Sequence, residues 1–411
     1  MVGNFGLWYK GTMGARALPM ARALVAAGHE VCMVVPPWDD PRSSGAEDRI
    51  DGVRIANVKL PPHIPLLWHA LLTLSLLVRV LREPADVIHV FKPKAYAGLV
   101  QIAAVWLRRL RLLRARIVLD TDDWEGKGGW NEMENFPRPV KWLTAWHESW
   151  CLRHADAITL ASRELERLTL ALGVSPDRIF YVPNGVCDLN SRARTASSGR
   201  SMLQGGDGED PDRSPSPLEE CSIRLDGSPT ILLYTRFFEF QAARVLRIFT
   251  GVRRDVPEAK LLVVGRGLRG EEGVLGRLAR DSGLGQDVFY AGWVEPPEIP
   301  RWFDLADLAI YPMDDTLLNR AKCPMKLVDL MSRGMPVVAD RVGQVAEYVK
   351  DGESGILVDS GAEETFAGAV ARLLLDERMR RDLGERARER VLGDFDWRCL
   401  IANVQKAYGR Q

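Results

Sequence analysis

Residues 308–339 read LAIYPMDDTLLNRAKCPMKLVDLMSRGMPVVA, and this stretch decides the expected fold. Leu308–Tyr311 has the length and composition of a buried strand, and a loop rich in charged residues follows it. The pattern becomes helical near Met325, and a second apolar run follows at Val337–Ala339. A strand, a helix and a strand in this order predict parallel strands joined by a right-handed crossover.

The same alternation runs through both halves of the 411-residue chain, which is long enough for two domains. In the first half we expect a helix over Ala15–Ala27 and strands at Val2–Phe5, Glu30–Val35, Val87–Phe91, Ile117–Leu119, Ala157–Leu160 and Ile179–Val182. In the second half the other expected strands are Thr230–Tyr234, Lys260–Val264, Val288–Tyr290 and Ile356–Val358, and charged helices close the chain between Glu363 and Tyr408.

The predicted fold is therefore α/β, with two Rossmann-like doubly wound parallel sheets facing across a ligand-binding cleft. A Ser-, Gly-, Pro- and Asp-rich segment at 188–227 has too few apolar residues for a core and predicts a flexible linker. The predicted parts are an N-terminal domain (1–187), this linker, a C-terminal domain (228–390) and a last helix (391–411) that returns to the first domain.

Composition narrows the function classes. Acidic and basic residues balance at 55 each, which argues against a nucleic-acid partner. Six scattered cysteines fit a reducing cytosol better than a disulfide framework. The first residues lack the features of a signal peptide, and the first strand starts so early that we expect a few residues to precede it. Ile64–Val78 is short for a membrane span and is predicted as a buried or interface-lying helix.

The charged loop after Tyr311 predicts an anion site. Arg320, Lys322 and Lys326 surround the start of the helix near Met325, where free N–H groups favour phosphate. Arg236 follows an earlier strand and suits a bidentate grip on a diphosphate. Asp329, one turn into the helix, suits ribose hydroxyls. The alternative is a salt-bridged loop without a ligand.

Two glycine-containing turns are weaker signals. Gly14 belongs to a Lys-Gly-Thr-Met-Gly segment at a predicted strand-to-helix turn. One interpretation is that backbone amides of this turn approach an anion, and the alternative is a tight turn without a ligand. Gly265, Gly267 and Gly270 match a dinucleotide fingerprint formally, and Gly265 is a candidate residue for binding the donor. We disfavour a nicotinamide cofactor because these glycines follow the second strand of their domain and no acidic residue ends the next one.

Asp120, Asp122 and Asp123 end a predicted strand in the first half. One interpretation is a pair of carboxylates that holds a divalent metal. The favoured one is that Asp122 and Asp123 are catalytic and stabilise a developing positive charge or orient an acceptor hydroxyl, with no metal required. The third is simple capping of the following turn.

Five tryptophans follow these aspartates. Trp142, Trp146 and Trp150 are four residues apart on one helix face, which predicts core packing. Trp124 and Trp130 lie among loop glycines, and we expect them to contact the sugar acceptor through their flat faces.

A basic segment precedes them. Between Val87 and Leu119 there are seven basic residues and no acidic one. Five arginines there alternate with Trp and Leu: Arg108, Arg109, Arg111, Arg114 and Arg116. This pattern predicts contact with an anionic membrane surface, and a solvated helix face is the alternative.

Several segments together resemble glycosyltransferase family 4, a retaining group within the GT-B fold. The similar segments are AAGHEV (26–31), VPNGV (182–186), KLLVVG (260–265), VFYAGWV (288–294) and DLMSRGMPVVA (329–339). The resemblance covers nearly the whole chain outside the linker. It implies a cytoplasmic enzyme that moves a sugar from a nucleotide-diphosphate sugar to a glycan, lipid-linked or small-molecule acceptor. A peripheral position on the inner face of the membrane is compatible with this activity. The donor would bind the C-terminal domain.

The chain departs from the family pattern at two places. The family's Glu-x7-Glu pair reads here as Ala321 and Asp329, so Asp314 or Asp315 would have to replace the sugar-contacting carboxylate. The lysine expected five residues after Arg236 is Gln241, and Lys322 and Lys326 are the candidates to supply that charge. A catalytically degenerate binding protein and a nucleotide-sugar epimerase are the alternatives that these departures leave open.

Overall fold

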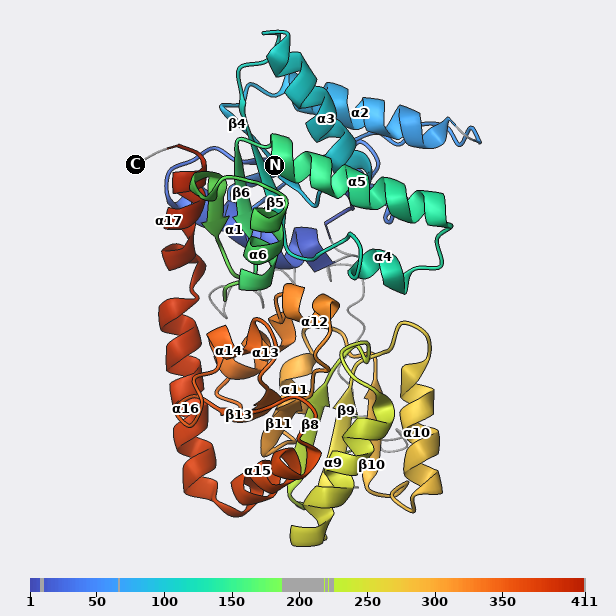
Figure 1. The fold of residues 1–411 in the computed structure, drawn as a ribbon, viewed down its shortest axis with the longest axis vertical. Coiled ribbons are helices and arrows are strands. Elements are labelled where there is room, and N and C mark those ends of the chain that lie inside the picture. The colour runs from blue at the N-terminus through green and yellow to red at the C-terminus, as the bar shows by residue number, and fades with distance from the viewer. Residues whose placement is uncertain (8–10, 66, 187–217, 219–220, 222–224, 410–411) are drawn as a thin grey trace, which may run out of the picture. The chain divides into compact units, whose positions relative to one another are not determined.

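The computed structural model describes residues 1–7, 11–65, 67–186, 218, 221 and 225–409 (Figure 1). The N-terminal unit comprises Met1–Gly185, Arg320–Cys323 and Phe395–Gln411, and the C-terminal unit comprises Val186–Asn319 and Pro324–Asp394. The predicted linker lies outside the described residues except for 218, 221 and 225–227.

The C-terminal unit is built on six parallel strands. Their order in the sheet is β10 (Val288–Gly292), β9 (Lys260–Val264), β8 (Thr230–Tyr234), β11 (Leu308–Tyr311), β12 (Val337–Asp340) and β13 (Ile356–Val358). Numbered along the chain, this order is 3-2-1-4-5-6. The direction of strand addition therefore reverses between β8 and β11, the point at which doubly wound sheets bind ligands.

Helices cover both faces of this sheet, because its strands are apolar on both sides. The helices are α9 (Ala242–Asp255), α10 (Glu271–Asp281), α11 (Ile299–Phe303), α12 (Leu317–Ala321), α13 (Met325–Ser332), α14 (Val345–Tyr348), α15 (Glu363–Leu375) and α16 (Glu377–Asp394). α9 packs on α15, where Phe249 and Phe366 are buried in one hydrophobic core of the unit (Figure 1).

The N-terminal unit combines two groups of strands. Four parallel strands have the order β4 (Val87–Phe91), β5 (Arg116–Thr121), β6 (Ala157–Leu160) and β7 (Ile179–Tyr181). The second group has the order β1 (Cys32–Val35), β3 (Val53–Asn57) and β2 (Glu47–Ile50), and β2 is antiparallel to β3. Val2 joins the groups, because it forms parallel bridges to both Val34 and Val90. The doubly wound α/β prediction is confirmed in both units.

One predicted strand was wrong, and one hairpin was not predicted. The expected strand at Val2–Phe5 is reduced to the bridge at Val2. Asn4 does not pair with a neighbouring strand, because its side chain accepts from the Ala97 N–H and its carbonyl accepts from the Trp38 indole. The β2–β3 hairpin was not expected at all. Asp51 and Gly52 form its turn with φ of 47° and 85°, the left-handed geometry that tight hairpins require.

Among its described residues, the N-terminal unit has the α-helices α1 (Leu18–Ala26), α2 (Trp68–Arg82), α3 (Ala95–Arg109), α4 (Trp130–Met133), α5 (Arg138–His154), α6 (Arg163–Ala171) and α17 (Trp397–Ala407). Its shorter helical turns are the π-helical η1 (Met13–Ala17) and the 3-10 helices η2 (Pro41–Ser43) and η3 (Pro176–Arg178). The core prediction for Trp142 and Trp146 was wrong, since these side chains are 69% and 45% exposed. α5 instead buries the face that carries Glu148 and Cys151.

Candidate functional site

Arg236 lies at the switch point of the C-terminal sheet, two residues after β8. Its side chain is exposed, and its guanidinium carbon is 5.8 Å from the ring centre of Phe238. The next residue, Phe237, is buried and has φ of 67°, which is unusual for a bulky residue. Such strain is kept where the surrounding structure enforces it, often beside functional sites.

Gly265 directly follows β9 and lies beside this turn. Its φ is 132°, and a Cβ at this position would overlap the carbonyl oxygen of Thr235. Only glycine therefore fits, and the backbone after β8 approaches β9 closely.

Two backbone amides of the glycine-rich segment after β9 are bonded to carboxylates of the first turn of α10. The Gly267 N–H donates to Glu272 Oε2 at 2.9 Å, and the Arg269 N–H donates to Glu271 Oε2 at 2.7 Å. The helix thus carries its own anions at the position where a dinucleotide phosphate would bind, which adds a physical reason to disfavour the nicotinamide interpretation.

Lys326 comes from the first turn of α13 and reaches the same end of β8. Its Nζ lies 3.2 Å from the ring centre of Tyr234, the last residue of β8, in a cation–π contact. The helix starts at Met325 as predicted, and Asp329 is half-buried one turn further on. Arg236 follows β8, and Lys326 contacts the last residue of the same strand, so two cations from different elements belong to this end of β8.

Asp314 is fixed by hydrogen bonds within the C-terminal unit. The Gln241 N–H donates to its Oδ2 at 3.1 Å, and Arg244 Nη1 lies 3.2 Å from its Oδ1. Arg244 also pairs at 2.7 Å with Asp340, a carboxylate whose pKa is raised by burial against the opposing effect of Arg244. Asp315, the other candidate, is exposed. Asp314 thus connects the loops that follow β8 and β11.

Arg320 and Lys322 are not brought to Arg236 within one unit. Both belong by their contacts to the N-terminal unit, where Arg320 Nε is 3.6 Å from Glu164 Oε1. Lys322 is buried there, and the carbonyl of the neighbouring Ala321 accepts a hydrogen bond from Ser162 Oγ at 2.5 Å.

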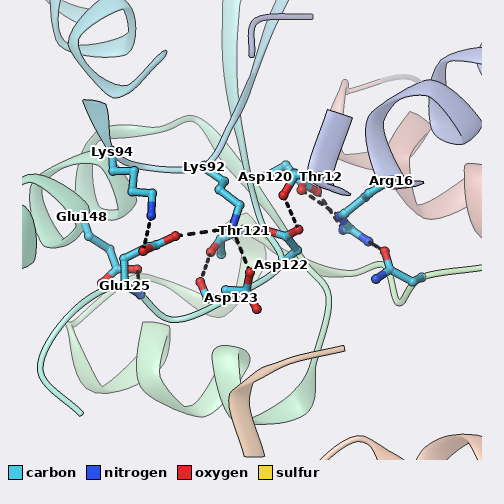
Figure 2. A network of polar contacts seen from close by, with 11 residues as sticks. Thr12, Arg16, Lys92, Lys94, Asp120, Thr121, Asp122, Asp123, Glu125 and Glu148 are labelled. Carbon is cyan, nitrogen blue, oxygen red and sulfur yellow. Dashed lines mark hydrogen bonds and ion pairs between the residues drawn. The ribbon is translucent and has the colours of Figure 1, made fainter. Parts of the chain in front are cut away.

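In the N-terminal unit, Figure 2 shows a polar network at the carboxyl ends of β4 and β5. Asp120 is fully buried and accepts two hydrogen bonds of 2.7 Å from Arg16, whose side chain is only 1% exposed. Asn184 Oδ1 and the Val182 carbonyl, each 2.9 Å away, accept the remaining bonds of Arg16. The Asp120 ion pair raises the pKa of Arg16 despite its burial.

A chain of hydrogen bonds leads from Asp120 to α17. Thr159 Oγ1 donates to Asp120 at 2.6 Å and lies 3.2 Å from His89 Nε2, while His89 Nδ1 lies 2.8 Å from the hydroxyl of Tyr408. Burial lowers the pKa of His89 to about 3, so this imidazole is neutral at neutral pH. The chain ties the C-terminal helix to the sheet.

The two predicted catalytic carboxylates share one lysine. Lys92 Nζ is 3.3 Å from Asp122 Oδ1 and 2.8 Å from Asp123 Oδ2 (Figure 2), and Thr12 donates to Asp122 at 2.9 Å. Burial raises the pKa of Asp122. Lys92 opposes this shift, whereas the negative charges of Asp123 and Asp120 add to it. Burial acts in the same direction on Asp123, but Lys92 holds the pKa of Asp123 below its ordinary value.

Lys92 itself was not predicted as a site residue. It directly follows β4 and has φ of 69°, and its carboxylate neighbours raise its pKa well above the ordinary value although burial opposes this. The signal in the sequence was a pair of lysines around a proline (Lys92-Pro-Lys94) at the carboxyl end of a buried strand.

Two glutamates continue the network. Glu125 is buried and pairs with Lys94 at 2.5 Å and with Lys92 at 3.4 Å. The Glu125 N–H in turn donates to Glu148 Oε1 on α5 at 2.9 Å. Burial raises the pKa of Glu148 to about 8, and the hydrogen bond from the Glu125 N–H opposes this shift.

The two loop tryptophans, which were predicted to contact the sugar acceptor, are not fully exposed. Trp124 is buried, and its indole donates to the Lys127 carbonyl at 3.0 Å. Trp130 is half-buried, and it adds to the effect of Lys92 that lowers the pKa of Asp123. Trp130 thus influences the predicted catalytic carboxylate, whereas Trp124 is buried and bonded to its own loop.

Gly14 lies within η1 rather than in a turn before the helix, so the predicted turn was wrong at this position. A Cβ there would be 2.8 Å from the Leu7 carbonyl oxygen, which explains why a small residue is needed. Lys10 of the same motif lies outside the described residues.

The metal interpretation of the aspartates meets a geometric objection, because both oxygens of Asp120 are used by Arg16. Within the part of the chain that the structure describes, no group of three or more His, Cys, Asp or Glu residues is arranged to hold a metal ion.

Two doubly wound units, each with polar residues at its strand ends, define a GT-B type of protein. Residues 11–185 match the family described as glycosyl transferase 4-like domain, and residues 222–390 match the family described as glycosyl transferases group 1. The chain therefore belongs to glycosyltransferase family 4 of the GT-B fold.

Relatives support this assignment. The chain is 30% identical over 210 residues to a GDP-mannose-dependent α-(1-6)-phosphatidylinositol monomannoside mannosyltransferase of Mycobacterium tuberculosis, a match that covers 48% of this chain and 53% of the relative. The chain thus spans about half the length of that enzyme. Glycogen synthase of the same organism is 23% identical over 97% of this chain and 91% of its own length.

Solved structures share the fold. Anabaena Alr3699/HepE in complex with UDP and glucose has a TM-score of 0.67 at 15% identity over 99% of each chain. Sucrose-phosphate synthase from Thermosynechococcus elongatus has a TM-score of 0.67 at 18% identity over 99% of this chain and 98% of its own.

Proposed function

We propose that this protein transfers a sugar from a nucleotide-diphosphate sugar to an acceptor hydroxyl, with retention of anomeric configuration. The observation that carries the proposal is the pair of cations at the switch point of the C-terminal sheet, Arg236 after β8 and Lys326 in the first turn of α13. Two cations and a helix start favour a doubly charged anion over a neutral sugar.

The donor diphosphate would be neutralised by these groups as it leaves. Arg236 supplies a planar, bidentate donor, and the first turn of α13 supplies N–H groups and positive potential. Asp329 is the candidate for the ribose hydroxyls. HepE and the mannosyltransferase are named with UDP and GDP-mannose, so uridine and guanosine diphosphate sugars are the first donors to test.

On the acceptor side, Asp122 and Asp123 would orient the attacking hydroxyl or stabilise positive charge on the sugar. Lys92 fixes both carboxylates and keeps Asp123 ionised. The named acceptors of relatives range from a phosphatidylinositol mannoside to glycogen, so a lipid-linked glycan or a polysaccharide is proposed as the acceptor class.

Calorimetry with UDP and GDP tests the donor half of the proposal. Arg236→Ala should weaken binding of the preferred nucleotide by about 1.5–3 kcal/mol, the range of charge-assisted hydrogen bonds. Arg254→Ala is the matched control, because this exposed arginine lies at the opposite end of α9. Unchanged affinity in Arg236→Ala would remove this residue from the site.

A binding protein without transferase activity is the second candidate, and one observation favours it. Ala321 supplies no carboxylate, and its carbonyl is engaged by Ser162. Incubation of the full chain with the preferred donor and a panel of acceptors decides between the two. Release of nucleotide diphosphate together with a glycosylated product supports transfer, and tight donor binding without product supports the second candidate.

A further inference from the structure

Three helices of the N-terminal unit expose an unusual amount of apolar surface. Among the described residues, fourteen of the twenty exposed large hydrophobic side chains lie between Ile64 and Trp146. They belong to α2, α3, α5 and the adjoining loops, and α3 packs against both α2 and α5 (Figure 1). Large apolar patches on a folded protein mark interaction sites.

α2 is apolar on both faces. Its buried side chains are Leu72, Leu76 and Val80. Its exposed ones, including the residue before its first turn, are Leu67, Leu74, Val78 and Leu81. The exposed set has spacings of seven, four and three residues, so its members share one side of the helix. A helix with apolar residues all round needs a partner on its outer face.

α5 has the same property with aromatic residues. Its inner face buries His147, Glu148, Cys151 and Leu152. Its outer face and the loop before it expose Phe136, Val140, Trp142, Leu143 and Trp146. Tryptophan is the residue type that prefers the boundary between lipid headgroups and acyl chains.

The end of α3 adds positive charge to this apolar surface. Leu110 and Leu112 are 66% and 72% exposed, and Arg109, Arg111 and Arg114 around them are exposed as well. The Arg109 guanidinium lies 4.9 Å from the ring centre of Trp106, which is itself exposed.

Arg108 differs from its neighbours, because it is ion-paired with Asp156 and is half-buried. It belongs to the folded unit rather than to the exposed basic group.

We propose that this surface of α2, α3 and α5 docks on a lipid bilayer that contains anionic lipids. Charge complementarity favours a bilayer over a second copy of the chain, because Arg109, Arg111 and Arg114 are exposed basic residues at the end of α3. Leucine, tryptophan and arginine together are also the composition of interfacial helices. No helix among the described residues is long and apolar enough to span a membrane, so the contact is with its surface.

This docking goes beyond the proposed transferase activity and does not depend on it. It would bring the acceptor-side unit to a surface where lipid-linked acceptors reside.

Sedimentation with vesicles tests the proposal on the full chain. Vesicles of phosphatidylcholine with 30% phosphatidylglycerol should bind the protein, pure phosphatidylcholine should bind it weakly, and high salt should release it. The triple variant Arg109→Glu, Arg111→Glu, Arg114→Glu should lower the partition coefficient by at least roughly a hundredfold, since each arginine contributes about fivefold.

The apolar part is tested by Trp142→Ser combined with Trp146→Ser, which should also reduce binding to anionic vesicles. Trp293→Ser is the matched control, because Trp293 is 65% exposed and belongs to the C-terminal unit. Unchanged melting temperatures and unchanged nucleotide binding show that the variants are folded.

Two results would overturn the proposal. One is equal sedimentation, or none, with neutral and anionic vesicles. The other is a dimer by light scattering that the tryptophan double variant dissociates, in a protein that binds no vesicles, because the surface would then join two copies of the chain.

Discussion

Glu148 offers a quantitative test of the network in the N-terminal unit. Its side chain is fully buried on α5, and burial raises its pKa to about 8 from an ordinary value near 4.5. Between these values the folded protein holds a proton that the unfolded chain has lost. The free energy of unfolding must therefore decrease as the pH rises through this window.

The magnitude follows from the width of the window. Each pH unit removes about 1.4 kcal/mol, so the contribution of Glu148 falls by roughly 4–5 kcal/mol between pH 4.5 and 8 and is constant above it. Glu148→Gln has nearly the same shape as the protonated acid and cannot ionise. We expect this variant to match the parent near pH 5 and to be more stable by several kcal/mol at pH 8.

Urea denaturation followed by tryptophan fluorescence is a suitable assay, because ten of the twelve tryptophans fall within the residue ranges of the N-terminal unit. Comparing variant with parent at each pH cancels the contributions of the other titrating groups. Glu132→Gln, at an exposed glutamate of α4, is the control and should show no such pH dependence.

A difference between Glu148→Gln and the parent that stays constant from pH 5 to pH 9 would refute the reasoning. It would mean that Glu148 ionises in the folded protein as easily as in water.

Three further predictions concern the same unit and the donor. Arg16→Met should lower the free energy of unfolding by about 3–5 kcal/mol, because it leaves Asp120 buried without its cation. Urea denaturation measures this loss of stability, and the double variant with Asp120→Asn should recover part of it. A loss of stability below about 1 kcal/mol would contradict the prediction. Lys92→Met should reduce kcat and shift the acidic limb of the pH–rate profile to higher pH, because Lys92 no longer lowers the pKa of Asp123. An acidic limb at the same pH as in the parent would exclude Asp123 as the titrating group. Turnover should persist in excess chelator, whereas a loss that magnesium or manganese restores would indicate a metal site.

The strands of both sheets were predictable because each is a short apolar run between turn residues. β4, β6, β8, β9, β11 and β13 have the predicted bounds. The β2–β3 hairpin was missed because Glu47–Ile50 is mostly charged and exposed, although the Asp51-Gly52 pair carried the signal of its turn. Edge strands of this kind bury little apolar surface and leave a weak pattern in the sequence.

Polar residues at strand ends were also predictable. Arg236, Asp122 and Asp123 were predicted in this way and lie just after β8 and β5, and their roles stay predictions. Arg16 could not be found, because it lies inside an amphipathic helix and its role depends on Asp120, 104 residues away. A buried ion pair between distant segments has no local signature. The same holds for Glu148, whose environment is set by the Glu125 backbone on another element.

The tryptophans of α5 show a more general ambiguity. A spacing of four residues indicates that one helix face is apolar, but it does not indicate what covers that face. The inner face of α5 is occupied by His147, Glu148, Cys151 and Leu152, so its apolar stripe points outward. α2 has an apolar outer face as well, and exposed arginines lie at the end of α3, which packs against both helices. Exposed apolar faces on neighbouring helices cost free energy in water, and a basic border makes an anionic bilayer the partner that best removes this cost.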